Sequence, residues 1–309
     1  MSSFNLVQIV PSLDSGGVER GTVDVANFLS ENQIQNFIIT SGGKMIKELD
    51  DSFTHVHELP VNSKNFFSYP LIATKINQFF KANNINLVHV SGGSWQYKGF
   101  LAAKLSNTRV IWHLNDTYVP FVFRAFFGLL GKYVDSYIFA SYRTKAYYDS
   151  FCNKNKKWSV IPAPVDTNVF SPSLIDDSIS ISNTQWKGKI VIGMVANISP
   201  VKGIDVFLNA LKIVSTSSHD IVFVVIGPIY ESQIKYFETF KKNIDPQIED
   251  NIVFLGAQKD VRPFLKFFDI YVCTSRFESS PISVWEAMSM GKPIVSTDVG
   301  DVPLYVENN

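Results

Sequence analysis

Short apolar runs alternate with amphipathic segments along the chain. In the first half, seven runs have the composition and length of buried parallel strands, at residues 6–10, 36–40, 55–59, 87–91, 109–113, 136–140 and 158–161. Segments with helical periodicity lie between them, at 17–30, 70–83, 98–106, 122–133 and 143–151. This alternation predicts a parallel sheet whose strands are joined by helices.

The second half repeats the pattern. Strands are expected at residues 190–195, 221–226, 252–255, 269–273 and 293–297, and helices at 203–215, 232–242, 261–268 and 281–290. A stretch rich in proline, serine and aspartate separates the two halves. We therefore expect an α/β fold with two doubly wound, Rossmann-like domains, at residues 1–165 and 187–309, with a linker at 166–186. Residues 299–309 show no further pattern, so the second domain is expected to be incomplete.

Composition narrows the class of protein. The chain has 309 residues, of which 46% are hydrophobic, so it can bury two cores. Its 28 basic and 28 acidic residues balance, which argues against nucleic acid as the main partner. No apolar run has the length of a membrane span, and the first residues lack a signal-peptide pattern. The two cysteines, Cys152 and Cys273, have neither disulfide nor zinc-site spacing. We expect a cytoplasmic protein that holds no metal.

Two glutamates follow the strand expected at residues 269–273. Glu278 falls in the loop beyond the carboxyl end of this strand, where open α/β sheets bind ligands. Glu286 falls in the next helix. The Ser-Ser-Pro sequence between them is typical of a helix start, with a serine N-cap and proline as the first helical residue. A carboxylate can accept two hydroxyl hydrogen bonds, and the amides of a helix start suit an anion such as a diphosphate.

This spacing resembles the E-x7-E signature of glycosyltransferase family 4, and the resemblance extends over the chain in order. It implies a GT-B fold, in which two domains face each other across a cleft. It also implies a retaining, metal-independent transfer with no cofactor besides the nucleotide-sugar substrate. Glu286 would hold the ribose hydroxyls of the nucleotide, and Glu278 the hydroxyls of the sugar. The implied donor-binding residues also include Ser279, Ser280 and Pro281.

A second segment is similar to the family's G-x-x-x-R-x-x-x-x-K-G pattern at the entry to the second domain. Lys202 stands at the lysine position, where its charge would stabilise the leaving diphosphate. Asn197 stands at the arginine position, and an amide donates hydrogen bonds without bringing a charge. Arg276 is therefore the candidate for replacing the missing cation.

Two features of the first half extend the resemblance. Gly16 and Gly17 follow the first expected strand, and without Cβ atoms they let a ligand approach the backbone closely. In the family, this loop faces the donor phosphates and the acceptor. His113 ends a later strand, where a family histidine reaches toward the donor sugar. The alternative for Gly16 and Gly17 is an ordinary structural turn, because Gly-Gly lacks the dinucleotide-binding spacing. The alternative for His113 is a structural histidine.

The implied acceptor is a glycan or a lipid-linked glycan, in cell-surface polysaccharide synthesis. Residues 98–157 carry ten Lys or Arg and three Asp or Glu among many aromatic residues. Such a surface binds anionic membranes peripherally, unless the aromatic residues form the core. Two other functions stay open: a sugar-nucleotide epimerase on the same fold, and a non-catalytic nucleotide-sugar-binding fragment, because the sequence ends soon after Glu286.

Overall fold

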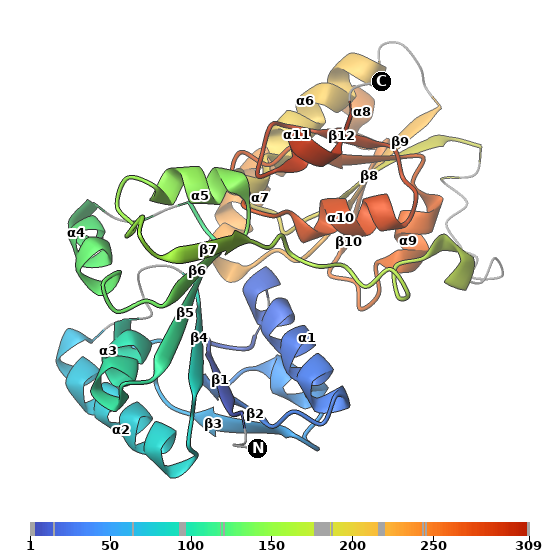
Figure 1. Cartoon of the computed structure of the whole chain (residues 1–309). Helices are drawn as coiled ribbons and strands as arrows, with labels where there is room; N and C mark the ends of the chain where they lie inside the picture. Colours follow the sequence, from blue (N-terminus) through green and yellow to red (C-terminus); the bar gives the residue numbers. More distant parts are fainter. Residues whose placement is uncertain are drawn as a thin grey trace. The chain divides into compact units, whose positions relative to one another are not determined.

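The computed structural model describes residues 4–14, 16–63, 65–92, 97–117, 119, 121–175, 186, 188–215, 220–242, 244 and 246–307. The chain divides into two compact units, Met1–Ala163 and Pro164–Asn309, coloured blue to green and yellow to red in Figure 1. Each unit contains one sheet, and every strand pair in both sheets is parallel. The predicted fold class is confirmed.

The first unit contains a seven-stranded sheet in the order β3-β2-β1-β4-β5-β6-β7. Its strands are β1 (Leu6–Ile9), β2 (Asn36–Thr40), β3 (Thr54–Glu58), β4 (Leu87–Ser91), β5 (Arg109–Leu114), β6 (Ser136–Phe139) and β7 (Lys157–Val160). Its helices are α1 (Gly17–Glu31), α2 (Tyr69–Ala82), α3 (Tyr97–Ser106), α4 (Phe121–Leu130) and α5 (Tyr142–Tyr148). All seven strands lie within one residue of their predicted ends. Helices α4 and α5 end three residues earlier than predicted, α4 directly before Gly131.

Helices cover both faces of this sheet. In Figure 1, α1 lies on one face, and α2 and α3 lie on the other. Trp112 of β5 anchors the larger core, where its ring lies 4.2 Å from that of Phe100 on α3 and 4.3 Å from that of Phe127 on α4. Tyr148 of α5 belongs to the same core. Aromatic residues of the basic segment thus fill the interior here; the side chains of Phe121, Phe123 and Phe126 lie outside the described residues.

The second unit contains a five-stranded sheet in the order β10-β9-β8-β11-β12. Its strands are β8 (Ile190–Val195), β9 (Ile221–Ile226), β10 (Ile252–Gly256), β11 (Ile270–Cys273) and β12 (Ile294–Ser296). Its helices are α6 (Ile204–Ser215), α7 (Ile234–Lys241), α8 (Pro246–Glu249), α9 (Arg262–Phe267), α10 (Ile282–Ser289) and α11 (Val302–Tyr305). Strand β8 pairs with β9 on one side and with β11 on the other, so the strand order reverses between β8 and β11.

Helix α11 corrects the expectation that residues 299–309 contain no further element. Its Tyr305 ring meets the Trp285 ring of α10 edge to face, with 5.5 Å between the ring centres. This four-residue helix is too short to produce a recognisable periodicity in the sequence. Its packing on α10, which depends on the tertiary structure, stabilises it.

The described part of the predicted linker packs on the second unit. Ile175 and Trp186 are buried in its core. The backbone oxygen of Phe170 accepts a hydrogen bond from Ser289 at 2.6 Å, and that of Ile175 accepts one from Lys266 at 2.6 Å. Residues 176–185, at the centre of the predicted linker, lie outside the described residues. Within the described residues, none of the helices combines the length and the apolar character that crossing a membrane requires.

Candidate functional site

Two loops of the second unit meet at the carboxyl edge of its sheet, where the strand order reverses. The Thr274 hydroxyl donates to the backbone oxygens of Lys202 and Gly203, at 3.2 and 2.8 Å. The amide of Arg276 donates to the backbone oxygen of Val201 at 2.7 Å. Open α/β sheets bind ligands at such a reversal point, because the loops from neighbouring strands diverge there.

Glycine is required at one position of this junction. Gly203 has φ +65°, in the left-handed region, and a Cβ placed on it would lie 2.0 Å from the backbone oxygen of Thr274. The Lys-Gly sequence therefore allows the loop after β8 to lie directly against the loop after β11.

Lys202 and Glu278 form an ion pair across this junction, between Nζ and Oε1. The Ser275 hydroxyl donates to the same Oε1 at 2.9 Å. The side chains of Lys202 and Glu278 are 28% and 15% exposed. Among the described residues, Oε2 of Glu278 and two of the three ammonium hydrogens of Lys202 have no other partner. Lys202 can therefore still donate hydrogen bonds to an anion, and Glu278 can still accept a hydrogen bond from a hydroxyl group.

Arg276 points toward helix α6. Its guanidinium donates to the two carboxylate oxygens of Asp205 at 2.9 and 2.5 Å, and to the backbone oxygen of Pro200 at 2.7 Å. These hydrogen bonds lower the pKa of Asp205 and raise that of Arg276. The charge expected to compensate for Asn197 is thus bound to Asp205, and Arg276 braces the turn that carries Lys202.

Helix α10 begins at Ile282, with Pro281 in the cap position and no side-chain cap. The expected serine N-cap is therefore wrong. The extended Pro281, with ψ 96°, delays the helix start by one residue, and the Ser280 hydroxyl instead accepts a hydrogen bond from Trp285 Nε1 at 3.0 Å. The backbone of Ser279 lies against Gly300, where an added Cβ would approach its oxygen to 2.5 Å.

Glu286 is half-buried on α10. It lies within electrostatic range of Tyr271 on β11, whose hydroxyl donates to the backbone oxygen of Val195 at 3.4 Å. Burial is the main cause that raises the pKa of Tyr271, and the charge of Glu286 contributes to the rise. Glu286 thus lies close enough to Tyr271 for its charge to act on the Tyr271 hydroxyl.

A pocket of about 180 Å³ lies at the carboxyl ends of β8, β9 and β10. Its lining includes Asn197, Gly227, Pro228 and Gln258. Gly227 has φ +154°, and a Cβ there would lie 2.0 Å from the backbone oxygen of Ala196. Glycine therefore keeps the loops after β8 and β9 in contact behind the pocket.

In the first unit, Gly16 and Gly17 begin helix α1. Gly16 is its N-cap, with φ +138°, and a Cβ on it would lie 2.4 Å from the Glu19 carboxylate. Burial raises the pKa of Glu19, and the charge of Asp14 adds to this rise. The Glu19 carboxylate thus packs against Gly16 at the start of helix α1.

His113 lies in β5 and stacks on His89 of β4. The ring centres are 5.4 Å apart, and Nε2 of His89 lies 3.3 Å from Nδ1 of His113. Burial lowers the pKa of His89 to about 4 and that of His113 to about 3, so both are neutral at pH 7. Nε2 of His113 is buried and has no hydrogen-bond partner within the described structure.

The sequence-predicted residues thus divide between the units. Around the strand reversal of the second unit lie Lys202, Asn197, Arg276, Glu278, Ser279, Ser280, Pro281 and Glu286, whereas Gly16, Gly17 and His113 lie in the first. The sequence reasoning missed Ser275 and Asp205; the Thr-Ser pair directly after β11 was the available signal for Ser275. Over the described ranges, His, Cys, Asp and Glu side chains nowhere form a group of three that could hold a metal ion.

Residues 15–169 match the family described as Glycosyltransferase Family 4, and residues 189–309 match Glycosyl transferases group 1. Together with the two Rossmann-like units, these matches define a glycosyltransferase of the GT-B class. The chain belongs to glycosyltransferase family 4.

Relatives agree with this assignment. The UDP-Gal:alpha-D-GlcNAc-diphosphoundecaprenol alpha-1,3-galactosyltransferase of Escherichia coli is 25% identical over 98% of this chain and 81% of its own length. A glycosyltransferase structure from Rickettsia africae matches with a TM-score of 0.87 and 24% identity, over 100% of this chain and 83% of that one. Anabaena HepE, solved with UDP and glucose, matches with a TM-score of 0.82 and 20% identity, over 98% and 83%.

Proposed function

We propose that the protein is a retaining, metal-independent glycosyltransferase that moves a sugar from a nucleotide-sugar donor to a glycan or lipid-linked acceptor. The Lys202–Glu278 pair carries this proposal, because it places a cation and a hydroxyl acceptor together at the strand reversal. A nucleotide sugar presents a diphosphate next to a ring of hydroxyls, so it offers a partner to each member of the pair.

Each residue near the pair has a role in this proposal. The free hydrogens of Lys202 would bind the diphosphate and stabilise its charge as the bond to the sugar breaks. Oε2 of Glu278 would accept sugar hydroxyls, and Glu286 would accept the ribose hydroxyls. The uncapped start of α10 adds backbone donors that favour an anion. Asn197 would contact the nucleoside in the 180 Å³ pocket.

The reaction would proceed on one face of the sugar. The bond between the anomeric carbon and the phosphate oxygen breaks, and the acceptor oxygen forms its bond on the face that the phosphate leaves. The leaving phosphate takes the proton of the acceptor hydroxyl. The first unit, with Gly16, Gly17 and His113, would serve mainly the acceptor and the reacting sugar. The Escherichia coli relative, whose name specifies a diphosphoundecaprenol-linked acceptor, supports a lipid-linked substrate and a role in cell-surface polysaccharide synthesis.

A transfer assay tests this proposal. The purified chain is incubated with UDP-galactose, UDP-glucose, UDP-N-acetylglucosamine or GDP-mannose, and with an N-acetylglucosaminyl diphospholipid acceptor, with and without EDTA. We expect transfer from one donor, unchanged by EDTA, and a product whose anomeric configuration by NMR equals that of the donor. A product with inverted anomeric configuration would contradict the retaining mechanism, and loss of transfer in EDTA would contradict metal independence. An epimerised nucleotide sugar without any transfer would favour the alternative function, a sugar-nucleotide epimerase.

We also propose that the protein acts in the cytoplasm, attached to the inner face of the membrane. The exposed side chains of Leu129, Tyr133 and Tyr142 lie in the basic segment at residues 98–157 and support this attachment. Flotation with phosphatidylglycerol vesicles tests it. We expect binding at low salt that weakens as salt is added, whereas no binding at any salt concentration would contradict attachment.

A further inference from the structure

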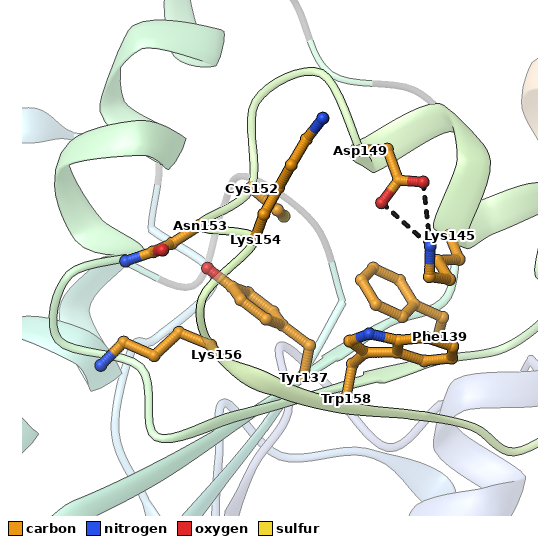
Figure 2. Close-up of a pocket in the computed structure, with 9 residues that line it drawn as sticks. All are labelled: Tyr137, Phe139, Lys145, Asp149, Cys152, Asn153, Lys154, Lys156 and Trp158. Atoms are coloured by element: carbon orange, nitrogen blue, oxygen red, sulfur yellow. Dashed lines mark hydrogen bonds and ion pairs between the residues drawn. The ribbon is translucent and has the colours of Figure 1, made fainter.

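A pocket of about 220 Å³ opens on the first unit, with a floor made by two neighbouring strands (Figure 2). Tyr137 of β6 pairs in register with Trp158 of β7, so both side chains point to the same face, together with Phe139 two residues further on. Strand β7 is at the edge of the sheet. Its Trp158 is therefore 48% exposed, whereas Tyr137 is 2% exposed.

The rim of this pocket is positively charged. Lys145 on α5 lies over the Trp158 ring, 4.6 Å from its centre, and pairs with Asp149 at 2.9 Å. Lys154 and Lys156 come from the loop that leads into the amino end of β7. Within the described part of the chain, the ammonium groups of these two lysines have no hydrogen-bond or ion-pair partner. Three lysines and one aspartate leave an excess of two positive charges.

An unpartnered hydroxyl lies at the base of the pocket. The oxygen of Tyr137 is buried, and no group among the described residues meets hydrogen-bond geometry with it. Burial is the main cause that raises its pKa, and the Cys152 thiol and the backbone amide of Asn153 also interact with it. In Figure 2, the ring directs this hydroxyl toward the loop that carries Asn153 and Lys154. Because an unpaired buried hydroxyl costs free energy, a polar ligand that reached it would gain affinity.

We propose that this pocket binds one ring of an anionic saccharide, a hexose that carries a carboxylate or a phosphate. The exposed part of the Trp158 ring that Lys145 does not cover can attract the C–H bonds on one face of a sugar ring. Lys154 and Lys156 would bind the acidic group, and the lone pairs of Asp149 that Lys145 leaves open would accept hydroxyls.

Two simpler ligands fit less well. Inorganic phosphate would leave the aromatic floor uncovered, and a neutral sugar would leave the two lysines without partners. The volume is smaller than the roughly 300–1,000 Å³ of pockets for drug-sized ligands, and a single ring suits it. The pocket extends from Phe139 at the carboxyl end of β6 to the loop at residues 149–156 at the amino end of β7, and its lining contains none of the residues assigned to the transfer reaction. It is therefore a second saccharide site, beyond the proposed transfer reaction.

NMR of the tryptophan indole N–H groups tests the proposal on the full chain, with the Trp158 signal assigned through Trp158→Phe. Glucuronate and glucose 6-phosphate should shift this signal, and they should bind at least about tenfold more tightly than glucose or inorganic phosphate. The double variant Lys154→Gln/Lys156→Gln should bind them about tenfold more weakly. The matched control, Lys241→Gln/Lys242→Gln on the exposed end of α7, should bind like the unmodified protein.

A third variant keeps the test independent of charge. Tyr137→Phe removes only the buried hydroxyl, so it should fold and bind both acids a few-fold more weakly. Unchanged binding in the double lysine variant would overturn the proposal. A Trp158 signal that responds to phosphatidylglycerol vesicles but to none of the soluble sugars would assign the pocket to a lipid headgroup and overturn it as well. These measurements do not depend on transfer activity, so the proposed function can hold if this site fails.

Discussion

Lys202 and Glu278 form an ion pair between residues 76 positions apart in the sequence. The pair lies where the strand order of the second unit reverses, and Ser275 fixes the shared carboxylate oxygen. The opposite charges are thus already in place before a donor binds. Little reorganisation would then be needed when charge develops on a leaving diphosphate, which is the condition under which electrostatic stabilisation is most effective.

The first prediction concerns Glu278. Glu278→Gln keeps the shape of the side chain but removes the charge that orients Lys202, so transfer should fall by roughly 100-fold or more. Glu238→Gln, an exposed change on α7 in the same unit, is the matched control and should retain full activity. Initial rates at saturating donor measure both. A Glu278→Gln variant with more than a tenth of the normal rate would exclude a direct role.

Glu286→Gln tests the grip on the nucleotide. An amide replaces one acceptor oxygen with a donor, so the variant should accept one fewer hydroxyl and show a donor KM roughly 10- to 100-fold higher. Circular dichroism and the melting temperature should stay close to the original, because Glu286 is only half-buried and glutamine keeps the size of its side chain. Undiminished turnover at low donor concentration would remove Glu286 from the site.

Asp205→Asn removes the ion pair in which the Arg276 guanidinium donates to both carboxylate oxygens of Asp205 on helix α6. Both side chains are more than two fifths exposed, so the free energy of unfolding should change little. The donor KM should rise several-fold, because the turn that carries Lys202 loses its brace. Glu48→Gln breaks the similarly exposed Arg20–Glu48 pair of the first unit and should leave the donor KM unchanged. Equal effects of the two variants would show that the brace has no specific role.

Gly203→Ala and Gly291→Ala form a matched pair. Both glycines have nearly the same left-handed φ, +65° and +68°, but only a Cβ at Gly203 meets a backbone atom. Alanine at Gly291 should cost about 1–2 kcal/mol for the left-handed conformation. Alanine at Gly203 should cost about 3 kcal/mol or more, since the clash with Thr274 adds to this. Urea unfolding measures the free energy lost by each variant. Equal losses would show that the contact between Gly203 and Thr274 adjusts to the extra Cβ with little loss of stability.

Acid should destabilise the fold through the histidine pair. An exposed histidine has a pKa of about 6.5, whereas His89 and His113 have values of about 4 and 3. At pH values between the folded and the unfolded pKa, the unfolded chain binds more protons than the folded chain. The free energy of unfolding therefore falls as the pH is lowered through this range. In His89→Gln/His113→Gln, the loss between pH 7.5 and 5 should be smaller by about 2–4 kcal/mol.

Urea unfolding at the two pH values measures this loss. The same double change at His55 and His57 of edge strand β3 controls for the removal of two imidazoles. If the His89→Gln/His113→Gln variant loses as much free energy of unfolding between pH 7.5 and 5 as the unmodified protein, the acid sensitivity arises elsewhere.

Local patterns explain why so much of the fold was predictable. The strands over 36–40, 87–91, 190–195 and 221–226 have their predicted ends, because a buried parallel strand is a short continuous apolar run. Helix ends were less predictable, as at Pro281, where the extended backbone of the proline itself decided the cap.

The site was predictable only in part. The sequence by itself determined two parallel α/β units and the glutamates that follow β11, because strand, turn and helix signals extend over only a few neighbouring residues. Only the tertiary structure decided that Lys202 meets Glu278, that Arg276 turns to Asp205, and that Tyr137 and Trp158 share a floor. The physical reason is strand order: side chains distant in sequence meet because non-local pairing of strands brings their loops and faces together.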